Sequence, residues 1–143
     1  MISAGAKTGV DPNILVGMAF KESTLGANMN AKGAAKGLYG VEKGQMKQIN
    51  KMFKLGLKTS DLTSLSAGSM AKVSLGVASY LQHYAGVYSG SADPRGTDVG
   101  LSAWRIGIGQ TRANIRAGNF WDYVDPHLHE SVAHYVDAVE GYQ

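Results

Sequence analysis

The spacing of apolar residues predicts helices along almost the whole chain. In the first long segment, four apolar residues recur at the three- and four-residue intervals of a helix: Ile14, Leu15, Met18 and Ala19. The preceding pair, Asp11 and Pro12, is typical of a helix start, because aspartate caps free backbone N–H groups and proline suits the first helical position. We expect this helix to end near Gly26 and a loop, with a short hairpin at most, to occupy residues 27–40.

The same pattern continues to the C-terminus. It predicts helices over residues 41–53, 66–88, 98–106 and 111–117. A second aspartate–proline pair, Asp125 and Pro126, predicts the start of a final helix. That helix carries an apolar stripe at helical spacing: Leu128, Val132, Tyr135, Val139 and Tyr142. Alternation with a period of two residues is scarce, so we predict one compact, mainly α domain over residues 1–143 with at most a small β-hairpin.

Composition and charge exclude several classes of protein. The chain has no cysteine, which excludes disulfides, thiolate metal sites and cysteine nucleophiles. The formal net charge of +3 is ordinary for a soluble domain, and the densest lysine run, over residues 43–58, lacks the interleaved aromatics of nucleic-acid binders. No apolar stretch reaches the roughly 18–20 residues of a membrane span, and residues 1–13 lack the features of a signal peptide. We therefore expect no nucleic-acid partner, no membrane span and no signal peptide in this chain.

Glu22 is the residue whose position most suggests chemistry. It follows Met18 by four residues and Leu15 by seven, so it shares their helix face and ends an otherwise apolar stripe. Burial there raises the pKa of a carboxyl, and the negative end of the helix dipole acts in the same direction. A carboxyl that keeps its proton near neutral pH suits a general acid. The spacing alone leaves open an alternative, a helix-end glutamate that turns to water.

Four motifs in series resemble the lytic transglycosylase domain related to goose-type lysozyme. Residues 10–23 (VDPNILVGMAFKES) resemble the family's "G-V-D-P-x-L" opening, apolar helix and "E-S". Residues 33–40 (GAAKGLYG) are similar to "G-A-x-G-L-M-Q", residues 103–109 (AWRIGIG) to "A-Y-N-A-G-x-G", and residues 130–136 (ESVAHYV) to "E-T-x-x-Y-V". The resemblance covers about residues 8–142. It implies a lysozyme-like, mainly helical α+β fold and cleavage of the β-1,4 bond between N-acetylmuramic acid and N-acetylglucosamine in peptidoglycan.

The resemblance also implies roles for individual residues. Glu22 would protonate the glycosidic oxygen and then accept a proton from the sugar's own 6-hydroxyl, which closes a 1,6-anhydro ring. Tyr135 matches the tyrosine that hydrogen-bonds the catalytic carboxyl, and Ser23 would orient that carboxyl or the sugar. The substrate-binding residues would be Gly37, Leu38, Tyr39, Gly40, Gln45, Trp104 and Arg105.

The chain departs from the family pattern at several of these positions. The family's glutamine is Gly40 here, which leaves a hole in the sugar groove unless Gln45 or Gln48 fills it. Tyr39 replaces a methionine and would stack on a sugar face. Where the family has tyrosine and asparagine, Trp104 keeps an aromatic ring in the groove and Arg105 would meet the lactyl carboxylate of muramic acid.

The acidic residues bear on the reaction product. A hydrolase that activates water usually carries a second carboxylate across the scissile bond. No aspartate or glutamate lies between Glu22 and Glu42, which favours the anhydro product, although folding could bring Asp93, Asp98 or Asp122 near. The alternatives are a hydrolytic muramidase on the same fold, a non-catalytic wall-binding or assembly module and, third, a nucleic-acid binder.

The sequence contains only a weak indication of a metal site. His129, Glu130 and His134 approach the H-E-x-x-H pattern of zinc proteases, but the histidines are five residues apart. Five residues turn a helix by about 500°, so the two rings lie on different faces. We predict no metal, no cofactor, and only a surface pair between Glu130 and His134. The expected partner is the peptidoglycan of the bacterial cell wall, reached by a monomer, or a domain of a larger phage protein, delivered as a virion component or endolysin.

Overall fold

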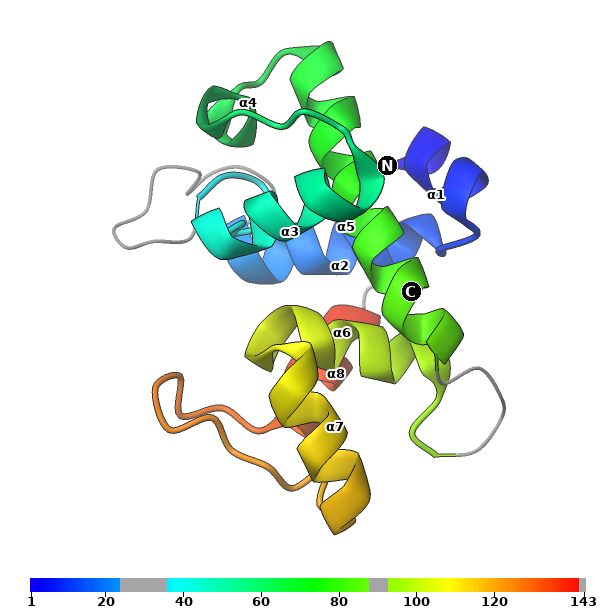
Figure 1. Cartoon of the computed structure of the whole chain (residues 1–143), viewed down its shortest axis with the longest axis vertical. Coiled ribbons are helices and arrows are strands. Elements are labelled where there is room, and N and C mark those ends of the chain that lie inside the picture. Colours follow the sequence, from blue (N-terminus) through cyan, green and yellow to red (C-terminus); the bar gives the residue numbers. More distant parts are fainter. Residues whose placement is uncertain (24–35, 88–92, 142–143) are drawn as a thin grey trace.

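A long central helix organises the molecule. In this computed structural model, which describes residues 1–23, 36–87 and 93–141, helix α5 (Ala67–Val87) packs against α1, α2, α3, α4 and α6 (Figure 1). The other helices of the described residues are α1 (Ile2–Thr8), α2 (Pro12–Ser23), α3 (Lys43–Phe53), α4 (Thr59–Thr63), α6 (Gly96–Ile106), α7 (Ile108–Ala117) and α8 (Val132–Glu140). The β interactions within these residues are two isolated antiparallel bridges, Lys36–Val41 and Val124–Ser131. The prediction of a single, mainly helical domain is confirmed.

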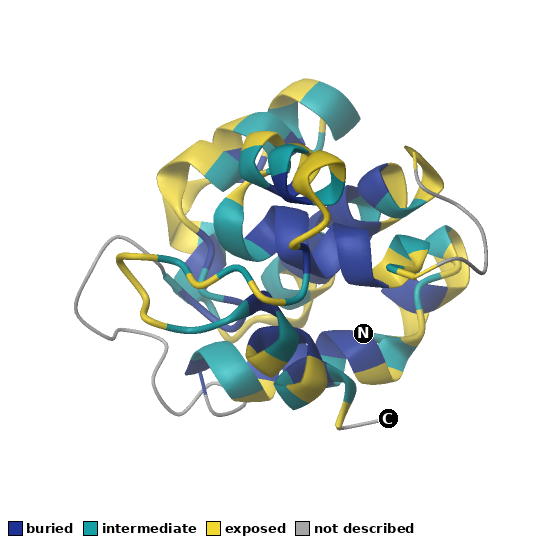
Figure 2. Cartoon of the chain, turned by 90° about the horizontal axis from the view of Figure 1, so that it is seen from below, coloured by how far each residue is buried: buried dark blue, intermediate teal, exposed yellow. Residues whose placement is uncertain are grey.

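The apolar stripes of the helices meet in one core. Figure 2 shows the buried residues gathered in the middle of the molecule, with exposed residues on the outer faces of the helices. On α5 the buried stripe includes Val73, Val77, Leu81 and Tyr84, at the spacing that the sequence predicts. These side chains and the other buried apolar residues hold the helices together, because each removes apolar surface from water.

One close helix contact positions the candidate site. Gly17, in the middle of α2, lies directly against the backbone of Val139 on α8, where an added Cβ would overlap the Val139 carbonyl oxygen. Glycine therefore allows the two helices to pack backbone to backbone. The contact sets Glu22, five residues further along α2, beside the residues of α8.

The final helix begins later than the sequence predicts. The side-chain oxygen Oδ1 of Asp125 accepts the N–H groups of His127 and Leu128 at 2.7 and 3.0 Å, which closes a turn instead of starting a helix. Helix α8 begins only at Val132, where the Ser131 hydroxyl accepts the backbone N–H of His134 at 3.1 Å. The prediction of a helix start at Asp125 and Pro126 is therefore wrong.

Other helix boundaries also differ from the predictions. The short helices α1 and α4 were not predicted, and α7 begins at Ile108 instead of Thr111. Helix α2 begins at Pro12 as predicted, with Asp11 Oδ1 accepting the N–H of Asn13 at 2.9 Å. Its predicted end at Gly26 and most of the predicted loop, residues 24–35, lie outside the described residues.

Two carboxyl groups meet where α6 begins and α8 ends. Asp98 and Glu140 each keep one buried oxygen without a hydrogen-bond donor, and Arg95 lies 3.6 Å from both side chains. Burial, followed by the hydrogen bond and the charge of Asp98, raises the pKa of Glu140 to about 7. A proton on Glu140 relieves the repulsion between the two carboxylates, so this junction responds to pH.

Candidate active site

The Glu22 carboxyl lies at the C-terminal end of α2, with only 14% of the side chain exposed. Its Oε1 accepts a hydrogen bond from Arg105 Nη1 at 3.3 Å. On the other side, the turn that follows the Lys36–Val41 bridge brings Gly40 so close that an added Cβ would lie 3.0 Å from Glu22 Oε2. The carboxyl is therefore enclosed by groups from three separate parts of the chain.

The protonation of Glu22 is set by opposing effects. Burial raises its pKa and is the largest influence, whereas the positive charge of Arg105, the hydroxyl of Tyr135 and the charge of Lys21 lower it. The nearby negative charge of Glu130 raises it further. Burial prevails, so the pKa of Glu22 lies above the ordinary value, in the direction that the apolar stripe predicts.

Tyr135, on α8, lies beneath Arg105 and faces Glu22. The guanidinium carbon of Arg105 is 4.9 Å from the centre of the Tyr135 ring, a distance typical of a cation–π contact. The side chain is fully buried. Its hydroxyl is near enough to Glu22 to lower the pKa of that carboxyl, and it has no other hydrogen-bond partner among the described residues. The structure thus places an unsatisfied donor beside the candidate acid.

Glu130 joins the positive charges around the site. It accepts hydrogen bonds from Lys21 Nζ at 2.7 Å and from Arg105 Nη2 at 3.0 Å, and it lies 2.7 Å from His134 Nδ1. Burial raises the pKa of Glu130, but these hydrogen bonds and charges outweigh it and hold the pKa below the ordinary value. The predicted pair with His134 is confirmed, whereas the sequence did not reveal the contacts to Lys21 and Arg105. We call Lys21, Glu22, Arg105 and Glu130 the charged cluster.

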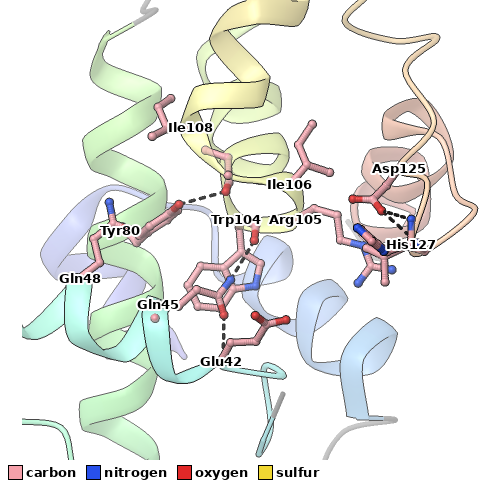
Figure 3. A pocket seen from close by; sticks show the side chains of 14 residues that line it. Glu42, Gln45, Gln48, Tyr80, Trp104, Arg105, Ile106, Ile108, Asp125 and His127 are labelled. Carbon is pink, nitrogen blue, oxygen red and sulfur yellow. Dashed lines mark hydrogen bonds between the residues drawn. The ribbon is translucent and has the colours of Figure 1, made fainter. Parts of the chain in front are cut away.

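A cavity of about 530 Å³ lies next to the charged cluster. Figure 3 shows Glu42 and Gln45, from the start of α3, on one side of it and Asp125 and His127, from the loop before α8, on another. Arg105 belongs to both features, because it lines the cavity and also contacts Glu22, which is not itself a lining residue. A ligand in the cavity therefore meets Arg105 before it meets Glu22.

Three of the predicted sugar-binding residues line this cavity. Each of their side chains already contacts other residues of the protein. The Gln45 amide donates to the Trp104 carbonyl at 2.8 Å and accepts the Glu42 N–H at 2.7 Å. Trp104 is largely buried and packs edge to face on Tyr80, with ring centres 5.1 Å apart. Arg105 is the third, with 21% of its side chain exposed. The cavity brings together Gln45, Trp104 and Arg105, and their role in sugar binding stays a prediction.

The turn over residues 37–40 supports the site but does not line the cavity. Leu38 and Tyr39 are buried, and the Tyr39 hydroxyl lies 2.7 Å from the Ser74 hydroxyl in the core. The prediction that Tyr39 stacks on a sugar is therefore wrong, because no ligand reaches its ring. Gly37 packs against the backbone of Leu62, where an added Cβ would overlap the carbonyl oxygen.

Ser23 does not line the cavity, and its side chain contacts the backbone instead. Its buried hydroxyl lies 2.7 Å from the Leu38 carbonyl oxygen and 2.9 Å from the Ala19 carbonyl oxygen. The hydroxyl therefore ties the end of α2 to the turn that carries Gly40. It positions the Glu22 carboxyl through the backbone.

The acidic residues that line the cavity are not those that the sequence suggested. The carboxylate of Asp93 accepts from the Trp121 indole N–H at 3.0 and 3.1 Å, and Asp98 is buried at the far end of α6 from Arg105. Glu42 and Asp125 line the cavity instead. The sequence around Glu42 or Asp125 contains no motif that identifies either as a cavity residue, because the cavity forms only when α3, α6 and the loop before α8 come together.

Residues 1–23, 36–87 and 93–141 offer neither a group of metal ligands nor a membrane-spanning helix. In these segments, no three histidine, cysteine or acidic side chains are grouped as ligands for a metal ion. None of the helices formed there is both long enough and apolar enough to cross a membrane. Compared with protein-family models, curated proteins and solved structures, the chain finds no match.

Proposed function

We propose that the chain is a peptidoglycan lytic transglycosylase in which Glu22 is the proton donor and acceptor. The observation that carries the proposal is the setting of Glu22: a largely buried carboxyl of raised pKa, beside the free hydroxyl of Tyr135 and next to a cavity. General acids of glycosidases need a carboxyl that carries a proton when it meets the glycosidic oxygen, and a raised pKa favours that state. The family resemblance of the sequence supplies the substrate and the reaction.

In this mechanism Glu22 first gives its proton to the glycosidic oxygen, and the bond between that oxygen and C1 of the muramic acid breaks. The oxocarbenium-like sugar is then attacked at C1 by its own 6-hydroxyl oxygen. The hydroxyl proton passes to the Glu22 carboxylate, which restores the acid. The Tyr135 hydroxyl, which lacks a partner in the resting site, is placed to donate to the carboxylate that exists between the two steps.

A single carboxyl is sufficient for this reaction, but the cavity also supports a second candidate. Because Glu42 and Asp125 line it, a water molecule activated by either carboxylate would make the enzyme a hydrolytic muramidase. The two reactions leave different ends, an anhydro ring or a reducing sugar. A phage-delivered lytic enzyme that acts on the cell wall is compatible with both.

The test is digestion of purified peptidoglycan by the wild type and by Glu22→Gln, followed by mass spectrometry of the products. We expect the wild type to clear a wall suspension and to release anhydro-muramic ends, and Glu22→Gln to bind walls without clearing them. Glu42→Gln is the matched control, since it changes a carboxyl in the cavity and should keep the activity. Reducing ends that disappear in Glu42→Gln would favour the muramidase.

A wild type that binds walls but never cleaves them would identify a non-catalytic wall-binding or assembly module. Equal clearing by the wild type and by Glu22→Gln would remove Glu22 from the mechanism. Circular dichroism of each variant verifies that the helices remain intact.

A further inference from the structure

Arg105 has two carboxylate partners that are held very differently. Glu130 accepts from Arg105 at 3.0 Å and is itself fixed by Lys21 and His134, each at 2.7 Å. Glu22 accepts from Arg105 at the longer distance of 3.3 Å. Because the stronger and better supported contact is with Glu130, the contact with Glu22 is the one that a competing anion would replace.

The cavity gives an anion access to Arg105. The guanidinium lines the cavity and also rests on the Tyr135 ring, so it can change partners while the ring and Glu130 keep it in place. Arginine presents its N–H donors in a planar fork that matches a carboxylate. An anionic group of a ligand in the cavity can therefore reach the guanidinium.

The net charge of the charged cluster determines what happens when an anion replaces Glu22 on Arg105. Lys21 and Arg105 supply two positive charges, and ionised Glu22 and Glu130 supply two negative ones, so the resting cluster is neutral. His134, largely exposed, adds a positive charge only when it is protonated. A ligand carboxylate would leave one negative charge in excess in a partly buried site, and a proton on Glu22 removes that excess.

We infer that Arg105 couples recognition of an anionic sugar to proton uptake by Glu22. A carboxylate of the bound sugar takes the place of Glu22 on Arg105, and Glu22 then takes a proton from solvent while the sugar carboxylate stays ionised. The inference rests on the proposed function, because it requires a glycan in the cavity. It makes Arg105 a specificity residue and Glu130 the positioning residue that holds it, so that the acid is loaded only when the correct sugar is bound.

The test follows the titration of Glu22 by carbon-13 NMR of the glutamate carboxyls, with Glu22→Gln to assign the signal. The probes are N-acetylmuramic acid and N-acetylglucosamine, because the first carries a lactyl carboxylate that the second lacks. We expect N-acetylmuramic acid to raise the titration midpoint of Glu22 by about one pH unit, at the lower end of the range for a nearby charge. N-acetylglucosamine should leave the midpoint unchanged.

Three variants separate the coupling from other causes. Arg105→Met should abolish the rise, whereas Arg112→Met, the same change on the exposed face of α7, should retain it. Glu130→Gln should still bind the sugar but show a smaller rise, because the Arg105 donor that Glu130 occupied is then free for the sugar carboxylate while Glu22 keeps its own contact. A rise that survives in Arg105→Met, or that is equal for both sugars, would overturn the coupling.

The same experiment distinguishes the inference from the function on which it rests. Binding of N-acetylmuramic acid at the cavity with no movement of the Glu22 midpoint contradicts the inference alone. Failure of both sugars to perturb any cavity signal, even at their solubility limits, contradicts the inference and the proposed glycan site together.

Discussion

Replacement of Gly40 by alanine offers a direct test of how Glu22 is placed. Gly40 has a φ of +60°, a left-handed backbone conformation, and an added Cβ would lie 3.0 Å from Glu22 Oε2 and 3.3 Å from Glu22 Cβ. The carboxyl end can rotate away from such a methyl group, but it then leaves its position beside Arg105. The substitution therefore combines backbone strain with a displaced carboxyl.

A second glycine separates these two effects. Gly56 has a φ of +64°, and an added Cβ there would have no atom within 4 Å. A left-handed alanine costs about 1–2 kcal/mol at either position. We expect both variants to lose this amount of unfolding free energy, and Gly40→Ala somewhat more, because the Glu22 carboxyl can rotate away from the new methyl group but Glu22 Cβ cannot. Only Gly40→Ala should lose activity, by about 100-fold, the cost of misplacing a catalytic group by about 1 Å.

The assays are urea denaturation for stability and clearing of a wall suspension for activity, both at a temperature where the two variants are folded. Equal activity in Gly40→Ala and the wild type would refute the reasoning, since the position of the Glu22 carboxyl would then not matter. Equal losses of activity in the two alanine variants would attribute the effect to strain alone. A much larger loss of stability in Gly40→Ala would show that the carboxyl cannot move.

Three further substitutions test other parts of the fold and site. Gly37→Ala should prevent stable folding, measured by circular dichroism, because the new Cβ would overlap the Leu62 carbonyl oxygen at a left-handed φ of +80°. Glu140→Gln removes a carboxyl whose pKa is raised to about 7 from 4.5. The stabilisation from its proton is complete below pH 4.5 and is lost as the pH rises through 7, so urea denaturation should show the wild type losing stability relative to the variant across that window. Tyr135→Phe removes a hydroxyl that lowers the pKa of Glu22, so NMR titration should show a higher pKa for the Glu22 carboxyl and wall clearing should slow.

Local patterns were sufficient to predict most of the helices. The start of α2 at Pro12 and the buried stripe of α5 follow from capping chemistry and from the 3.6-residue period, which depend only on neighbouring residues. The second aspartate–proline pair shows where such reasoning fails. Asp125 forms a similar side-chain cap, but Val124 and Leu128 are 52% and 44% exposed, so no apolar face is buried there to continue a helix.

The candidate acid was likewise predictable, and most of its surroundings were not. The spacing of Glu22 from Leu15 and Met18 placed the carboxyl at the end of an apolar stripe and predicted a raised pKa, but it left open a side chain turned to water; the burial of Glu22 in the folded chain decided between the two. The burial of Tyr39 was decided by Ser74, a hydrogen-bond partner 35 residues away. A turn residue can face the core or the solvent, and its own neighbours in sequence do not specify which.

The charged cluster belongs wholly to the tertiary structure. The hydrogen bond between Lys21 and Glu130 joins residues 109 apart, and the one between Glu22 and Arg105 joins residues 83 apart. These partners meet because Gly17 allows α2 to lie against α8 and because α6 packs between α5 and α8. The period of a helix determines which face a side chain occupies, whereas the charges opposite that face depend on how the helices pack, which is a property of the whole chain.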